Sequence, residues 1–105
     1  MANPHAGEVA LRLGGEVRTC KLTLGALAEL EADLGEESLV DLVARFESGR
    51  VSSRDVLALI VAGLRGGGWR GDRESLLSLD VGGGPVGAAR VAAELLARAF
   101  GGAAG

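Results

Sequence analysis

Nine consecutive residues, Val56 to Leu64, have side chains that carry no charge and form no hydrogen bonds. On a helix, the larger of these apolar side chains would cover more than half of the circumference, and such a helix is normally buried. The segment is too short to cross a bilayer, which requires about 20 residues. We therefore expect a central helix enclosed by the rest of the chain or by a partner. Ala58, Ala62 and Gly63 would give it a shallow side that another backbone can approach closely.

Capping residues and amphipathic spacing predict four further helices. Their predicted bounds, each with the residue that begins it, are 24–34 (Thr23), 39–48 (Ser38), 73–80 (Asp72) and 85–100 (Pro85). The central helix is predicted to begin at the cap Ser52, with Asp55 three residues later, and to end before the glycines 66–68. Apolar spacing predicts buried stripes of Leu24, Leu27, Leu30 and Leu34, then Leu39, Leu42, Val43 and Phe46, then Val86, Ala89, Ala92, Ala93, Leu96 and Phe100.

The segments 8–13 and 16–22 flank Gly14-Gly15, and the first of them alternates apolar and polar residues, so they predict a β-hairpin. A two-residue Gly14-Gly15 turn would place Glu16 and Arg18 opposite apolar side chains. We therefore predict a three-residue loop, Leu13-Gly14-Gly15, with Gly15 in a left-handed conformation. The predicted cross-strand pairs are Leu11 with Val17, Val9 with Thr19, and Arg12 with Glu16.

Together these elements predict a single α+β domain, mainly α, spanning all 105 residues. The N-terminal hairpin, 8–22, would pack on a small bundle of four to five helices formed by 23–100. The ends, 1–7 and 101–105, show no periodicity and are expected to be disordered tails.

The sequence contains few groups suited to catalysis. It has one cysteine, Cys20, and one histidine, His5, which falls in a predicted tail. No histidine is therefore placed to activate a nucleophile, and one Cys plus one His cannot supply the four ligands of a typical zinc site. We predict no catalytic, cofactor-binding or metal-binding residue, no cofactor and no small-molecule substrate.

Charge and hydropathy argue against two classes of partner. The net charge of −3 gives no concentrated positive surface for nucleic acid or anionic lipid. No apolar segment is long enough to span a membrane. The glycine runs 66–68 and 82–84 lack the strand, lysine and helix of a phosphate-binding loop, and we interpret both as linkers that stop helices.

Trp69 lies among arginines, which is a pattern seen at single-stranded nucleic-acid sites. Asp72 and Glu74 are interspersed with these arginines, so a solvated polar loop is the favoured interpretation. Trp69 itself has two interpretations that the sequence does not separate. It can cover the core, or it can anchor a protein contact, because Trp is enriched at interface hot spots.

Four strings follow one another along the chain: GEVALRL, KLTLGALAELEADLG, SLVDLVARF and SSRDVLALIVAGLRGGG. Together they resemble the gene transfer agent family protein of the phage tail module, which is grouped with phage tail assembly chaperones. The resemblance runs from about residue 7 to residue 100. It implies a non-enzymatic tail assembly chaperone that acts in the bacterial cytoplasm, binds the tape-measure protein and helps recruit tail-tube subunits.

Two other functions remain open from the sequence. The chain can be a minor structural, tube-associated tail protein that adds its hairpin to a neighbouring sheet, or an unrelated regulatory adaptor. In either tail role the apolar surfaces would bind protein partners, and a homo-oligomer is possible. The predicted partner-binding residues are Leu11, Val17, Leu24, Leu27, Leu30 and Trp69.

Overall fold

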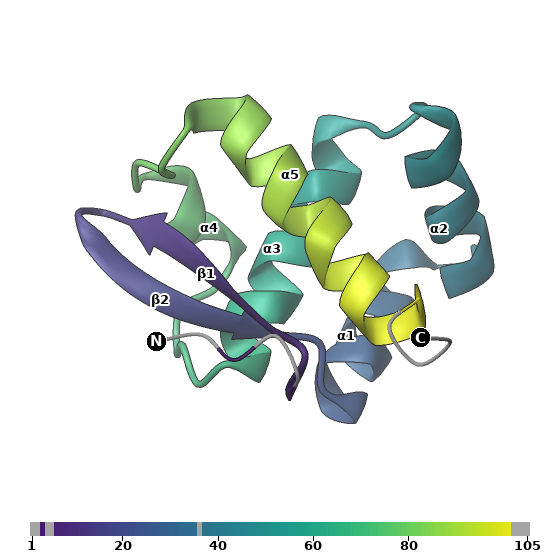
Figure 1. Ribbon diagram of the computed structural model, residues 1–105, viewed down its shortest axis with the longest axis horizontal. Helices are drawn as coiled ribbons and strands as arrows, with labels where there is room; N and C mark the ends of the chain where they lie inside the picture. Colours follow the sequence, from purple (N-terminus) through teal and green to yellow (C-terminus); the bar gives the residue numbers. More distant parts are fainter. Residues whose placement is uncertain (1–2, 4–5, 36, 102–105) are drawn as a thin grey trace.

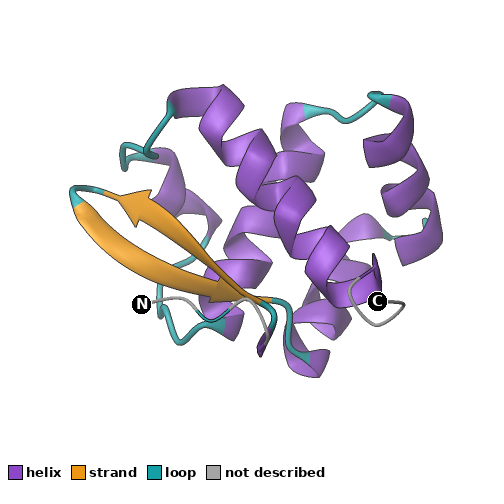
Figure 2. Cartoon of the chain, in the orientation of Figure 1, coloured by secondary structure: helices purple, strands orange, loops and turns teal. Residues whose placement is uncertain are grey.

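A two-stranded antiparallel hairpin begins the fold, and helices form the rest of the chain (Figures 1 and 2). The computed structural model describes residues 3, 6–35 and 37–101. The elements are β1 (Glu8–Leu13), β2 (Glu16–Lys21), α1 (Leu24–Leu34), α2 (Leu39–Ser48), α3 (Ser53–Gly66), α4 (Arg73–Leu77), α5 (Gly84–Leu96) and the π-helical turn η2 (Ala97–Gly101). This arrangement confirms the α+β, mainly α prediction. The predicted tails lie largely outside the described residues.

The central helix, α3, is in contact with β2, α1, α4 and α5. Leu59 and Leu64 are fully buried, and the neighbouring small residues Ala58 and Ala62 are buried as well, at 3% exposure each. Figure 1 shows α5 crossing in front of α3, with the hairpin and α1 at its lower end. The prediction that the apolar segment is enclosed is confirmed for residues 58–60 and 62–64, whereas Val56, Leu57 and Val61 are only half-buried.

Glycines let the hairpin and α5 approach α3 closely. A Cβ atom added at Gly63 would lie 2.6 Å from Leu95 Cδ1 and 3.3 Å from Cys20 Cβ. A Cβ at Gly66 would overlap the carbonyl oxygen of Lys21, and one at Gly67 would overlap that of Thr19. The first glycine run thus does more than stop the helix, because it allows the backbone of β2 to pack directly on the last turn of α3.

The predicted hairpin register is wrong. β1 and β2 are joined by a two-residue turn, Gly14-Gly15, with φ values of +58° and +86°, and the strands pair Leu13 with Glu16, Arg12 with Val17, Leu11 with Arg18, and Val9 with Cys20. Both turn residues have the positive φ of a type I′ turn, which glycine adopts without strain.

The observed register is tolerated because the two strands are covered unequally. Leu11 and Leu13 of β1 are buried, whereas the turn end of β2 faces solvent. There Glu16 and Arg18 form an ion pair with each other, 3.1 Å apart, and remain exposed. Glu16 and Arg18 lie opposite apolar residues of β1 but are not buried. A two-residue turn therefore carries no cost of burying charge.

Residues 80–82 extend the sheet on the far side of β1. Gly14 N donates to Asp80 O at 2.9 Å, and Gly82 N donates to Arg12 O at 2.8 Å. Val81 forms a bridge with Leu13. Because these backbone groups pair with β1, the helix predicted over 73–80 ends early, at Leu77.

The helix caps follow the sequence closely. Thr23 Oγ1 accepts a hydrogen bond from Ala26 N at 3.1 Å, and Ser38 and Ser52 each form a complete capping box. The predicted burial of the amphipathic faces is only partly observed. Leu30 and Leu42 are fully buried, but Leu24 is 85% exposed and Leu27 is only half-buried.

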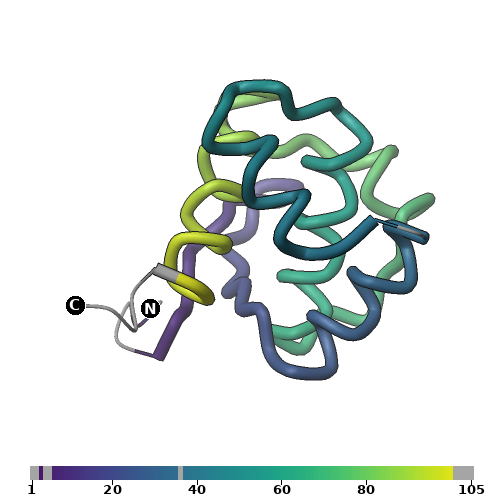
Figure 3. Tube along the Cα trace, turned by 90° about the vertical axis from the view of Figure 1, so that its right-hand side faces the viewer, coloured from purple at the N-terminus to yellow at the C-terminus, as the bar shows by residue number. Residues whose placement is uncertain are grey.

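α5 is rotated relative to its predicted orientation, and its C-terminal end packs beside β1 (Figure 3). The predicted burial is confirmed for Ala92 and Leu96, but Val86, Ala93 and Phe100 are exposed, and Leu95, outside the predicted stripe, is 1% exposed. The rotation follows from the contact with Gly63, because the absent side chain leaves room for Leu95.

Candidate protein-binding groove

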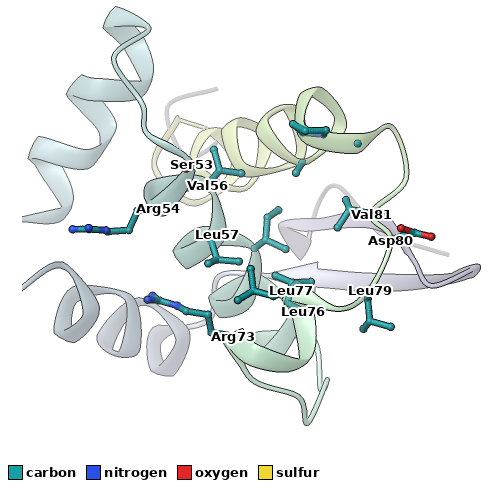
Figure 4. Close-up of a pocket in the computed structure, with 14 residues that line it drawn as sticks. Ser53, Arg54, Val56, Leu57, Arg73, Leu76, Leu77, Leu79, Asp80 and Val81 are labelled. Carbon is teal, nitrogen blue, oxygen red and sulfur yellow. The ribbon is translucent and has the colours of Figure 1, made fainter.

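An open apolar groove of about 710 Å³ lies between α3, α4 and the N-terminal end of α5 (Figure 4). Pockets of 300 to 1,000 Å³ are typical of binding sites. The groove's main apolar side chains are Val56, Leu57, Leu76, Leu77, Leu79 and Val81. We refer to this set, with the polar residues at its ends, as the α4 groove.

The short helix α4 creates one wall of the α4 groove. Asp72 begins it by accepting a hydrogen bond from Ser75 N at 2.9 Å. Leu76 is 4% exposed and packs into the core, but Leu77 is 69% exposed. Adjacent residues on a helix point about 100° apart, so a single short turn cannot bury both leucines. Leu79 follows, is 40% exposed and lies above the turn glycine Gly14.

The two ends of the α4 groove carry opposite charges. Arg54 and Arg73 lie at one end and Asp80 at the other, as Figure 4 shows. Arg73 Nη2 is 3.9 Å from Asp33 Oδ2, which is the outer limit of an ion pair. Within the described part of the chain, the side chains of Arg54 and Asp80 form no hydrogen bond or ion pair. These two charges are therefore available to a partner.

A second, smaller cleft of about 410 Å³ separates α2 from the C-terminal end of α5 and η2. Val43 and Phe46 of α2 line it on one side, and Leu96 and Phe100 on the other. Phe100 is 45% exposed here. Glu47 is the one charged residue in its lining, so this cleft lacks the paired charged ends of the α4 groove.

The predicted partner-binding residues do not converge on one surface. Leu11 and Leu30 are buried in the chain's own core, at 2% and 0% exposure. Val17 and Leu24 are exposed at 64% and 85%, on β2 and α1 respectively. Leu27 is half-buried. Partner binding through these residues stays a prediction, and none of them lines the α4 groove.

Trp69 is half-buried and packs against the hydrophobic core. Its backbone N donates to Leu64 O at 2.9 Å, and its ring lies against Gly71, where a Cβ atom would overlap it. Arg65, which precedes the loop, is held by Glu29 Oε1 at 3.0 Å and by Gly71 O at 3.1 Å. The loop is thus tied to α1 and α3, and the core-covering interpretation of Trp69 is observed.

The α4 groove is not among the features predicted from the sequence, although its signal is present there. Leu76, Leu77, Leu79 and Val81 follow one another within the stretch RESLLSLDV. This stretch holds more apolar side chains than a helix of five residues can bury. An apolar surplus on a short capped helix is therefore the feature that indicates the exposed surface.

The reactive groups are placed as follows. Cys20 is fully buried, and burial raises the pKa of its thiol to about 12, so it packs as a small apolar residue. His5 lies outside the described residues. Across residues 3, 6–35 and 37–101, no cluster of three or more His, Cys, Asp or Glu side chains is arranged to hold a metal ion. None of the described helices is both long and apolar enough to span a bilayer.

Comparisons with known proteins assign the chain to a family. Neither the curated proteins nor the solved structures gave a match. The family described as "Phage tail tube protein, GTA-gp10" matches residues 6–102. This match includes the hairpin, all five α-helices and the α4 groove, and it confirms the resemblance to a tail-module protein of gene transfer agents. The chain belongs to the phage tail tube protein GTA-gp10 family.

Proposed function

We propose that this protein is a non-enzymatic structural component of the tail of a phage-like gene transfer agent, associated with the tail tube. The observation that carries the proposal is the family match over residues 6–102, because the family's description names a tail tube protein. Of the two tail roles considered from the sequence, this supports the structural one better than the tail assembly chaperone.

The surface of the molecule is suited to such a role. Leu77 and Leu79 remain exposed beside the α4 groove, although the chain has a well-formed core. Contiguous exposed apolar surface commonly marks a protein-protein contact. A tail component must contact its neighbours, and the α4 groove offers a contiguous, mainly apolar surface for that contact.

The proposal is tested by purifying particles and measuring the copy number of this chain relative to the tail-tube subunit by quantitative mass spectrometry. A structural component stays in the particles through density-gradient separation and a high-salt wash. A chaperone is absent from purified particles and instead co-purifies with the tape-measure protein from cell extracts. That second outcome would reject the structural role and support the chaperone role, including its tape-measure and tail-tube partners.

A pair of variants connects this test to the α4 groove. Leu77→Asp places a charge in the exposed apolar wall and should reduce the amount of chain retained in particles. Val40→Asp makes a similar change on α2, where Val40 is 76% exposed and is not part of the groove lining. If particles retain the Val40→Asp chain at the wild-type level but lose the Leu77→Asp chain, the contact lies at the α4 groove.

A further inference from the structure

We propose that the α4 groove binds a second copy of this chain across a two-fold axis, with the α4 helices of the two copies antiparallel. This inference rests on the proposed structural role, because it names one neighbour that a tail component would contact. Two observations support it. One is the order of charges along the groove, and the other is the position of α4 beside it.

The charge order is self-complementary. Along α4 and the turn that follows, Arg73 comes first, Leu77 is in the middle and Asp80 is last (Figure 4). A two-fold axis passing near Leu77 reverses this order in the second copy. Arg73 then faces Asp80 of the second copy, and Asp80 faces the arginine end of the second copy. Both contacts form at once, as a two-fold interface requires.

Arg54 strengthens this pattern. It lies at the same end of the α4 groove as Arg73, and its side chain has no partner within the described residues. Asp80, at the opposite end, also lacks one. Opposite charges that are unpaired within one copy become paired between two copies, whereas a parallel arrangement would bring like charges together. The charges therefore fix the relative orientation of the copies.

The shape of the surface suits the same arrangement. α4 forms a ridge, with Leu77 exposed on it, and the groove runs alongside between α4 and the N-terminal ends of α3 and α5. A ridge beside a groove is complementary to itself after a rotation of 180°. Each α4 would enter the groove of the other copy and cover Leu77 and Leu79. Apolar burial would then supply most of the affinity.

The test measures the mass of the full-length purified chain by sedimentation equilibrium. One copy has a mass of 10.6 kDa, and the proposal expects the wild type to form a dimer. Asp80→Arg makes both groove ends positive, and the double variant Arg54→Asp/Arg73→Asp makes both ends negative. Each variant alone should raise the dimer dissociation constant by about tenfold or more, because attractive exposed pairs are replaced by repulsive ones.

Mixing the two variants gives the most specific result. A positive-ended chain and a negative-ended chain should form a heterodimer although neither forms a homodimer. Placing all three substitutions in one chain should restore the homodimer. Circular dichroism confirms that each variant is folded. The matched controls are Glu31→Arg and the double variant Arg50→Asp/Arg90→Asp, which change exposed residues outside the groove lining and should dimerise as the wild type does.

Three outcomes would overturn the inference. The wild type could sediment as a monomer at every soluble concentration, the groove variants could dimerise as well as the controls, or the mixed variants could fail to associate. A monomer that is nevertheless retained in purified particles leaves the proposed structural role intact and indicates that another tail protein occupies the groove. A charge-dependent dimer that is absent from purified particles would reject the structural role and leave the dimer inference intact.

Discussion

Arg45 of α2 donates two hydrogen bonds to the carboxylate of Asp55 in α3, from Nε to Oδ2 at 3.0 Å and from Nη2 to Oδ1 at 2.9 Å. Asp55 is 7% exposed and also accepts the backbone N–H of Ser52 in the capping box of α3. The guanidinium of Arg45 is in contact with Glu37 as well. Leu42 is the one fully buried apolar side chain of α2, and the ion pair attaches α2 to α3 in addition to the core contacts of Leu39, Val43 and Phe46.

Arg45→Met should lower the free energy of unfolding by about 2–3 kcal/mol, because it leaves the buried Asp55 carboxylate without its charged partner. Urea denaturation at pH 7 measures the loss. Arg50→Met is the matched control, because Arg50 is exposed, and it should change stability by less than about 0.5 kcal/mol. If both variants lose the same free energy of unfolding, the Arg45–Asp55 ion pair contributes no more to stability than an exposed arginine does.

Acid should destabilise the protein through its capping carboxylates. Burial raises the pKa of Asp55, but hydrogen bonds from Arg45 and the Ser52 backbone outweigh burial and leave the pKa below its ordinary value. The backbone N–H groups of Ser38 and Ser75 likewise lower the pKa values of Asp41 and Asp72.

Carboxylates with lowered pKa values stabilise the fold fully above their unfolded pKa of about 3.9, and this stabilisation is lost as the pH falls through the folded pKa. The melting temperature should therefore be flat from neutral pH down to about pH 5 and fall steeply below about pH 4. Asp55→Asn should be less stable at pH 7 and show a shallower acid decline. An unchanged decline in Asp55→Asn would assign the acid sensitivity to other groups.

Gly66→Ala should destabilise the protein by about 1–3 kcal/mol, because the added methyl group overlaps the carbonyl oxygen of Lys21. Gly25→Ala provides a control of identical chemistry. The nearest atom to a Cβ at Gly25, in α1, lies 3.9 Å away, so alanine fits there and should stabilise the helix by about 0.5–1 kcal/mol. Thermal and urea denaturation would reveal the opposite signs, and a neutral Gly66→Ala would contradict the close contact.

The thiol of Cys20 should not react in the native protein. It is fully buried and its pKa is raised to about 12, so the reactive thiolate is both scarce and shielded. Ellman's reagent added to the folded chain should give no rapid phase, and the same chain in concentrated urea should react at once with one equivalent per chain. A fast, stoichiometric reaction without denaturant would mean that the contact between the hairpin and α3 opens readily.

The sequence predicted the features that local chemistry determines. Thr23, Ser38, Ser52 and Asp72 cap the helices as expected, since each cap depends on residues within one turn of it. Most of the apolar segment Val56 to Leu64 is buried, because almost any fold would have to bury it. These predictions needed no knowledge of which elements become neighbours.

The errors share a different origin, because they depend on contacts between distant segments. The hairpin register depends on how far β2 extends beyond the bundle, which lets Glu16 and Arg18 pair in solvent. The rotation of α5 depends on Leu95 meeting Gly63. The α4 groove depends on which of two adjacent leucines turns inward, and only the assembled α3 and α5 decide that.

The backbone contact of Gly66 and Gly67 with β2 has a consequence for how this protein meets its neighbours. The hairpin cannot swing away from α3 or exchange with a hairpin of another molecule without breaking that contact and exposing Cys20 and Leu64 to water. In the proposed assembly, each copy would therefore arrive with its shape already set and would lose little conformational entropy on joining. The spacing and angles between the proposed subunits would then be set by the shape of the separate copies.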